Sequence, residues 1–134
     1  GTSIYGLGGQ AGALLRNEVV RNCWNSDPAG YGPGTQKVYT SHPFAFIVLP
    51  DGQCCGVLAD CTDHLQVDTR DNHLTFTSNP HPTKARDKDY ATSVQTEARQ
   101  YPQRPRAFPV ILFHAPDPKA LVKKLGQACG TMAL

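Results

Sequence analysis

The sequence lacks the features that mark several large classes of protein. Its formal net charge is only +2 over 134 residues, so it has no excess of basic side chains for nucleic acid. It has no apolar run near the roughly 20 residues that a membrane-spanning helix requires. Its five cysteines include no C-x-x-C pair, and its five histidines are scattered without metal-ligand spacing. We therefore expect no nucleic-acid partner, no membrane span, no metal and no cofactor.

The glycine-rich segment at residues 6–9 does not have the features of a dinucleotide-binding loop. It has the sequence Gly-Leu-Gly-Gly, but neither a strand–loop–helix unit nor a phosphate-binding lysine accompanies it. We predict a loop at residues 6–9 and no dinucleotide site.

The cysteines are odd in number and have no repeated spacing. Adjacent Cys54 and Cys55 rarely bond to each other, because a disulfide between neighbours strains the intervening peptide. Their adjacency predicts a strand with one thiol on each face. Unpaired, buried cysteines favour a reducing compartment, such as the cytosol or an organelle stroma or matrix.

What the sequence does contain is a series of short apolar segments separated by Gly, Pro, Asn and Asp. This pattern is typical of a mainly β domain. We expect strands at residues 19–24, 44–49, 54–59, 64–68, 73–77 and 108–113. The segment 44–49 is almost continuously apolar, so both of its faces should be covered. Turns at residues 50–52 and 71–72 should join the segments from 44 to 77 into an antiparallel meander.

The end of the chain predicts one short helix. Asp117 and Pro118 suit the N-cap and the first helical position, and Gly130 suits its end. Leu121, Val122, Leu125 and Ala128 should form its apolar face. Between the strands and this helix, residues 79–106 are polar, charged and rich in Pro, which indicates a long surface excursion within one domain spanning residues 1–134.

The segment 24–35 is the best candidate for chemistry. Gly, Pro and Asp27 lie between Trp24 and Tyr31, which favours a rigid, shaped loop. Exposed aromatic rings beside a carboxylate suit a sugar, which presents an apolar ring face and hydroxyl groups. Asp27 also suits an Asx-type turn before Pro28, and the two roles are compatible.

Catalytic residues are harder to place. A glycosidase needs two carboxylates that flank the scissile bond. Asp51 lies in a turn, while Asp63, Asp68 and Asp71 lie at polar strand ends, where a solvated surface role is expected. Ser41 and His42 are adjacent on an extended segment and point to opposite faces, so they cannot act as nucleophile and base. We assign no catalytic residue in this chain.

Several segments, taken in order, resemble glycoside hydrolase family 31, the α-glucosidases and their relatives. Tyr-Gly-Leu-Gly at residues 5–8 looks like the family's Tyr-Gly-x-Gly-Glu opening, and Trp-Asn-Ser-Asp at 24–27 looks like its Trp-Asn-Thr-Asp segment. Further matches follow at residues 30–35, 39–43, 49–52, 56–60, 108–111 and 130–132. Gly9 departs from the pattern, because the family usually has Glu there.

This resemblance implies a galactose mutarotase-like antiparallel β-sandwich with one short C-terminal helix. In the family, the catalytic carboxylates lie in a (β/α)8 barrel that follows this segment and is absent from this chain. The match to Trp-Asn-Thr-Asp implies that Asp27, with Ser26 beside it, lines the leaving-group sugar subsite. Both residues would bind substrate, and neither would be catalytic.

Two hypotheses follow from the sequence. In the first, the chain is the non-catalytic N-terminal domain of a retaining α-glucosidase-type hydrolase. It supports the barrel, on the same parent protein or on another chain, and meets an α-glucoside or glucan at the barrel's rim. In the alternative, it is a standalone carbohydrate-binding or protein-interaction module that has lost the barrel, which Gly9 and the excursion at 79–106 favour.

Overall fold

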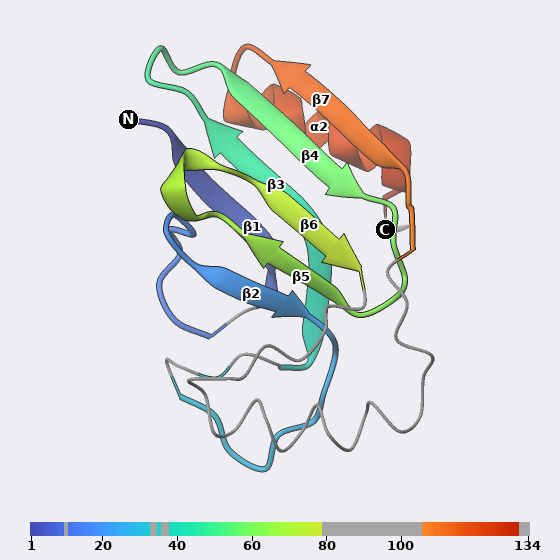
Figure 1. Ribbon diagram of the computed structural model, residues 1–134. Coiled ribbons are helices and arrows are strands. Elements are labelled where there is room, and N and C mark those ends of the chain that lie inside the picture. Colours follow the sequence, from blue (N-terminus) through green and yellow to red (C-terminus); the bar gives the residue numbers. More distant parts are fainter. Residues whose placement is uncertain (10, 33–34, 36–37, 79–105, 132–134) are drawn as a thin grey trace.

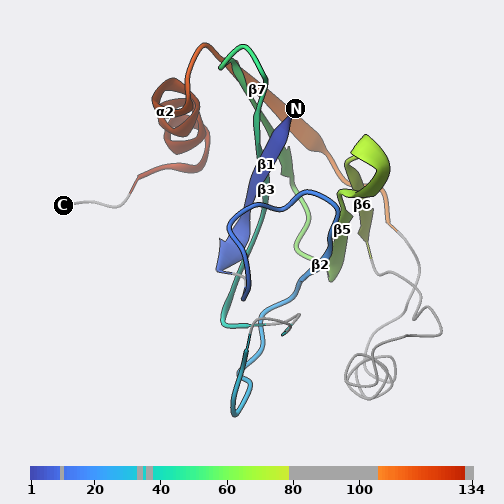
Figure 2. The same cartoon turned by 90° about the vertical axis from the view of Figure 1, so that its left-hand side faces the viewer.

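The computed structural model describes residues 1–9, 11–32, 35, 38–78 and 106–131. The described elements are β1 (Ser3–Gly9), β2 (Val20–Cys23), β3 (Thr40–Val48), β4 (Cys54–Ala59), β5 (Leu65–Asp68), the 3-10 turn η1 (Arg70–Asn72), β6 (Thr75–Ser78), β7 (Val110–Ala115) and α2 (Pro118–Cys129). They form three layers (Figures 1 and 2): α2, a four-stranded sheet in the order β1-β3-β4-β7, and a three-stranded sheet in the order β2-β5-β6. All strand pairs are antiparallel, so the predicted mainly β class with one C-terminal helix is confirmed.

The single antiparallel meander expected for residues 44–77 is wrong. β3 and β4 form a hairpin in the four-stranded sheet, whereas β5 and β6 pair in the other sheet. The chain crosses between the sheets after Ala59. Alternation within β5 buries Leu65 and Val67, but a period of two residues specifies a buried face and not the neighbouring strand.

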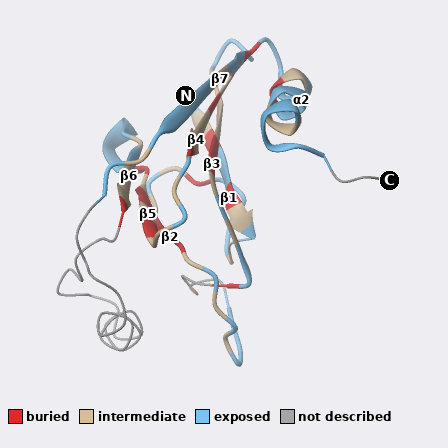
Figure 3. Cartoon of the chain, turned by 90° about the vertical axis from the view of Figure 1, so that its right-hand side faces the viewer, coloured by how far each residue is buried: buried red, intermediate tan, exposed pale blue. Residues whose placement is uncertain are grey.

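Two apolar clusters hold the layers together, and β3 contributes to both. Phe44 belongs to the cluster between the four-stranded sheet and α2, together with Leu121. Ala45 belongs to the cluster between the two sheets, together with Leu65 and Val67. The buried residues gather along these boundaries in Figure 3. The prediction that both faces of this strand are covered is therefore confirmed.

The predicted loop at residues 6–9 is instead the second half of β1. The strand contains a bulge at which Gly6, Leu7 and Gly8 have φ angles of 97°, 67° and 84°. Backbone of the neighbouring strand also approaches closely, because a Cβ on Gly8 would lie 2.6 Å from the backbone nitrogen of His42. Glycine serves here to form a bulge against β3, and glycine-rich sequence alone does not distinguish a bulge from a loop.

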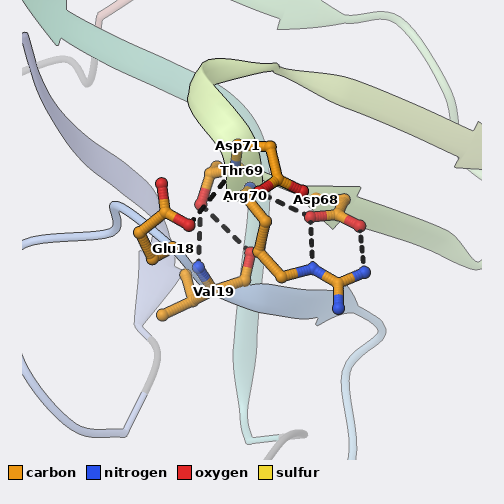
Figure 4. A network of polar contacts seen from close by, with 6 residues as sticks. All are labelled: Glu18, Val19, Asp68, Thr69, Arg70 and Asp71. Carbon is orange, nitrogen blue, oxygen red and sulfur yellow. Dashed lines mark hydrogen bonds and ion pairs between the residues drawn. The ribbon is translucent and has the colours of Figure 1, made fainter.

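A buried threonine joins the start of β2 to the end of β5 (Figure 4). Thr69 is 1% exposed, and its hydroxyl oxygen accepts a hydrogen bond from the Val19 N–H at 3.1 Å. The same hydroxyl lies within donating distance of the carbonyl oxygens of Arg16 and Val19. Beside it, the Arg70 guanidinium donates to both carboxylate oxygens of Asp68. These contacts anchor the turn at residues 70–72.

The helix α2 has the predicted caps but a narrower buried face than expected. The Asp117 carboxylate accepts from the Ala120 N–H at 2.9 Å, and Gly130 ends the helix with a φ of 84°. Leu121 is fully buried, whereas Val122 is 57% exposed. Ala128 is also exposed, so only Leu121 and Leu125 of the predicted apolar face pack in the cluster beneath the helix.

All five cysteines are free; Cys54 is buried and Cys55 is half-buried, as expected for neighbours on opposite faces of a strand.

The predicted excursion at 79–106 lies outside the described residues except for Arg106, whose backbone N–H donates to the Ser78 hydroxyl at 2.7 Å. Among the described helices, none has the length and apolar character needed to cross a membrane.

Candidate functional site

The aromatic loop at residues 24–35 leaves the end of β2 and is held by backbone contacts. The Ser26 N–H donates to the carbonyl of Val38 at 3.0 Å. Further along, the Thr35 N–H donates to the Gly32 carbonyl at 3.0 Å, and the Gly32 N–H donates to the Thr35 hydroxyl at 3.0 Å. The described part of this loop is therefore a shaped segment with fixed ends. Pro33 and Gly34 lie outside the described residues.

Asp27 and Ser26, the two residues expected to bind sugar, lie on this loop. Asp27 is exposed and Ser26 is half-buried. Between described residues, no hydrogen bond reaches the Asp27 carboxylate, so the Asx-type turn, which the sequence offered beside sugar binding, is not formed by them. Asp27 therefore presents its carboxylate to the surroundings of the loop, where it can accept hydrogen bonds from hydroxyl groups.

Trp24 lines an open depression at the base of the loop. Its ring lies 5.4 Å from the His64 ring, centroid to centroid, and the His64 Nε2 lies 3.3 Å from the Oδ1 of the buried Asn22. The depression has a volume of about 370 Å³. Its lining combines one aromatic ring with amide, hydroxyl and carboxylate groups: Cys23, Trp24, Asn25, Ser41, Pro43, Cys61, Thr62 and Asp63. The depression therefore offers hydrogen-bonding groups beside one aromatic ring.

Asp63 was not expected in this position. The sequence places it at a polar strand end, but the crossing from β4 to the other sheet brings residues 61–63 beside Trp24. Cys61 and Cys23 lie in the same wall, and burial raises the pKa of the Cys23 thiol to about 11. We therefore do not regard Cys23 as a nucleophile. No sequence signal identifies Asp63, because its position depends on which sheet receives β5.

A second shallow hollow lies beside Tyr31. Tyr31 is 63% exposed, and its ring packs edge-on against Tyr39 with 6.0 Å between the centroids. The hollow has a volume of about 460 Å³ and is lined by Tyr31, Gly32 and residues 11–13. Neither hollow has Ser26 or Asp27 in its lining. The structure thus keeps Tyr31 out of the core, whereas Phe44 is buried in it, as the sequence indicates.

Asp51 has the turn role expected of it, whereas Asp68, expected to be a solvated surface residue, forms an ion pair with Arg70. The Asp51 carboxylate accepts from the Gln53 backbone N–H at 3.0 Å and thereby shapes the β3–β4 turn. Hydrogen bonding from Arg70 lowers the pKa of Asp68 below its ordinary value of 3.8. Among the described residues, no group of three or more His, Cys, Asp or Glu side chains is arranged to hold a metal ion.

The family model of the glycosyl hydrolase 31 N-terminal galactose mutarotase-like domain matches residues 1–68, half of the chain. The chain belongs to this family. Its fold is similar to that in the crystal structure of a family 31 α-glucosidase from Bacteroides thetaiotaomicron, with 29% sequence identity and a TM-score of 0.72. The family resemblance and the β-sandwich expected from the sequence are thereby confirmed.

The two structures differ greatly in extent. The match covers 100% of this chain but 19% of the α-glucosidase chain, so the family 31 domain spans about a fifth of its solved relative. No curated protein matches this chain.

Proposed function

We propose that this family 31 domain supports the catalytic barrel of an α-glucosidase-type hydrolase and lines the barrel's leaving-group sugar subsite. The observation that carries the proposal is the match of the whole chain to 19% of a family 31 α-glucosidase. Because the chain resembles only one segment of a larger hydrolase, we infer that it packs against the catalytic barrel and supports it. The barrel would lie on the same parent protein or on another chain, and residues 1–134 would act as a single domain.

The contribution to the subsite rests on the loop at residues 24–35. Asp27 presents an exposed carboxylate, and the Ser26 hydroxyl lies beside it in the sequence. A carboxylate accepts hydrogen bonds from the paired hydroxyls of a sugar, and aromatic rings such as those of Trp24 and Tyr31 pack on its apolar face. The ligand proposed here is an α-glucoside or glucan, held at the rim of the barrel's site.

The same features support binding and not catalysis within this chain. Hydrolysis needs an acid and a second carboxylate on either side of the scissile bond. Asp51 is engaged in a turn and Asp68 in an ion pair, and the depression that Asp63 lines does not include Asp27, so none of these is placed opposite Asp27 for that role. The alternative of a standalone binding or interaction module is not favoured, because the likeness found is to a segment of a hydrolase.

Substitution of Asp27 in the proposed hydrolase, with this domain and its barrel together, tests the subsite. A hydrogen bond to a charged group contributes about 1.5–3 kcal/mol, so Asp27→Asn should lower kcat/KM for maltose by roughly 10- to 100-fold. The loss should be much smaller for a nitrophenyl glucoside, whose leaving group is not a sugar. Asp60→Asn is the matched control, because Asp60 is also exposed but lies at the end of β4. Equal losses on both substrates, or none on maltose, would contradict the assignment.

Activity of the separated chain tests the supporting role. The 134-residue chain alone should hydrolyse neither maltose nor a nitrophenyl glucoside, and adding the barrel should restore cleavage. Hydrolysis by the lone chain would show that the catalytic groups lie within it.

A further inference from the structure

The two outer edges of the four-stranded sheet differ in how they are covered. At the β1 edge, the Ile4 N–H donates to the Asn17 side-chain oxygen at 2.8 Å, and the Ile4 carbonyl accepts from the Arg16 N–H at 2.7 Å. The Gly6 carbonyl accepts from the Arg16 side chain at 3.4 Å. The segment that follows β1 therefore satisfies the backbone of that edge. The β7 edge has no neighbouring strand among the described residues.

The phase of the β4–β7 ladder shows which groups of β7 point away from β4. The Asp60 N–H donates to the Pro109 carbonyl at 2.9 Å, in the same register as the rest of the pair. Hydrogen-bonded and non-bonded pairs alternate along antiparallel strands. Val110, Leu112 and His114 therefore direct their N–H and C=O groups toward the outer edge. The Lys124 ammonium donates to the His114 carbonyl at 2.6 Å, so among the described residues Val110 and Leu112 form the open part of the edge.

The side chains at this open edge are apolar and face the space between the sheets. Val110 and Leu112 lie opposite Ala59 and Val57, which belong to the cluster between the two sheets. Directly opposed residues project from the same face. Yet Val110 is 47% exposed and Leu112 is 74% exposed. The facing sheet ends at β6, and β7 lies beyond it (Figures 1 and 3).

We propose that a β-strand from the remainder of the hydrolase pairs with residues 110–112 of β7 and covers Val110 and Leu112. This inference rests on the proposed function, because it takes the chain to be part of a longer hydrolase. The strand would carry aliphatic side chains toward the space between the sheets and a carboxylate beside Lys124. Exposed, uncharged edges of this kind are templates for strand addition.

A second copy of the chain fits this edge less well than a segment of the same protein. The open window is two residues long, whereas a stable protein–protein interface buries about 800 Å² on each partner. A tethered segment needs little area, because its effective concentration replaces much of the contact energy.

Hydrogen exchange in the 134-residue chain and in the longer hydrolase that the proposal requires, called the longer protein below, tests the proposal without an activity measurement. The amides of Val110 and Leu112 should exchange rapidly in the chain alone, and at least about 100-fold more slowly in the longer protein. The Ile111 amide, which faces β4, is the internal control and should be protected in both. Rapid exchange of Leu112 in a longer protein that still hydrolyses maltose would overturn this inference and leave the proposed function intact.

A substitution provides the second measurement. Leu112→Lys should leave the melting temperature of the 134-residue chain unchanged and lower that of the longer protein by several degrees, because the lysine would meet the paired strand. Leu14→Lys is the matched control, because Leu14 is 82% exposed and follows β1, which forms the opposite edge of the sheet from β7. A concentration-dependent dimer of the 134-residue chain that Leu112→Lys abolishes would identify a second copy as the occupant and overturn the proposal.

Discussion

Gly8 and Gly52 form a natural pair for measuring how much the close approach of β1 and β3 constrains the fold. Their φ angles are 84° and 85°, so an alanine at either position must adopt a positive φ. Their surroundings differ. A Cβ on Gly8 would lie 2.6 Å from the His42 nitrogen and 2.9 Å from the Ser41 Cα, whereas Gly52 has nothing within 4 Å. The difference between the two alanine variants therefore isolates the cost of the backbone contact.

The expected magnitudes follow from these distances. An L-residue in the left-handed region costs about 1–2 kcal/mol, which sets the expected loss for Gly52→Ala. Gly8→Ala adds a displacement of backbone, since a contact of 2.6 Å cannot be relieved by rotating a side chain. Overpacking of this kind costs a further 1–3 kcal/mol or so, for a total of about 2–5 kcal/mol.

Urea unfolding followed by the fluorescence of the single tryptophan, Trp24, measures both variants. With a slope of about 1–3 kcal/mol per molar urea, a loss of 3 kcal/mol lowers the midpoint by roughly 1–3 M. Far-ultraviolet circular dichroism checks that the transition remains a single one. If Gly8→Ala and Gly52→Ala unfold at the same urea concentration, the close contact between β1 and β3 is not present and the reasoning fails.

Two further predictions concern the turn at residues 70–72. Thr69→Val should destabilise the fold by about 1–3 kcal/mol in urea, because it leaves the Val19 N–H without its acceptor in a buried position, whereas Thr69→Ser keeps the hydroxyl and should lose less; the reverse order would contradict this role. Asp68→Asn should lower stability slightly at pH 7. Because the Arg70 hydrogen bonds depress the folded pKa of Asp68 below 3.8, its contribution is present above that pH and is lost as the pH falls through the folded value. The gap between wild type and Asp68→Asn should therefore close in acid, and a gap that widens there would show that the ion pair is not the cause.

Local signals were sufficient for several elements. The continuous apolar segment of β3 predicts a strand covered on both faces, and Phe44 and Ala45 confirm it by packing in different clusters. The Asp117-Pro118 pair predicts the start of α2, because a carboxylate cap and a fixed φ act within a single turn of chain. Interactions between neighbours in sequence are visible without any knowledge of the fold.

Where partners are distant in sequence, local signals were insufficient. Glycine at residues 6 and 8 fits a loop as well as a bulged strand, and only the approach of β3 decides between them. Strand alternation buries Leu65 and Val67 in either sheet, so it could not show that the chain leaves the meander after β4. For the same reason, Asp63 could not be placed beside Trp24.

The sequence by itself determined the mainly β class, most strand positions, the capped helix and, through ordered motifs, the family to which the chain belongs. It also singled out the loop that carries Asp27, whose role in binding stays a prediction. Only the tertiary structure decided the division into two sheets, the lining of the depression beside Trp24 and the open edge of β7. The physical reason is that hydrophobic periodicity specifies which face of a segment is buried, whereas pairing and packing over long separations specify what covers that face.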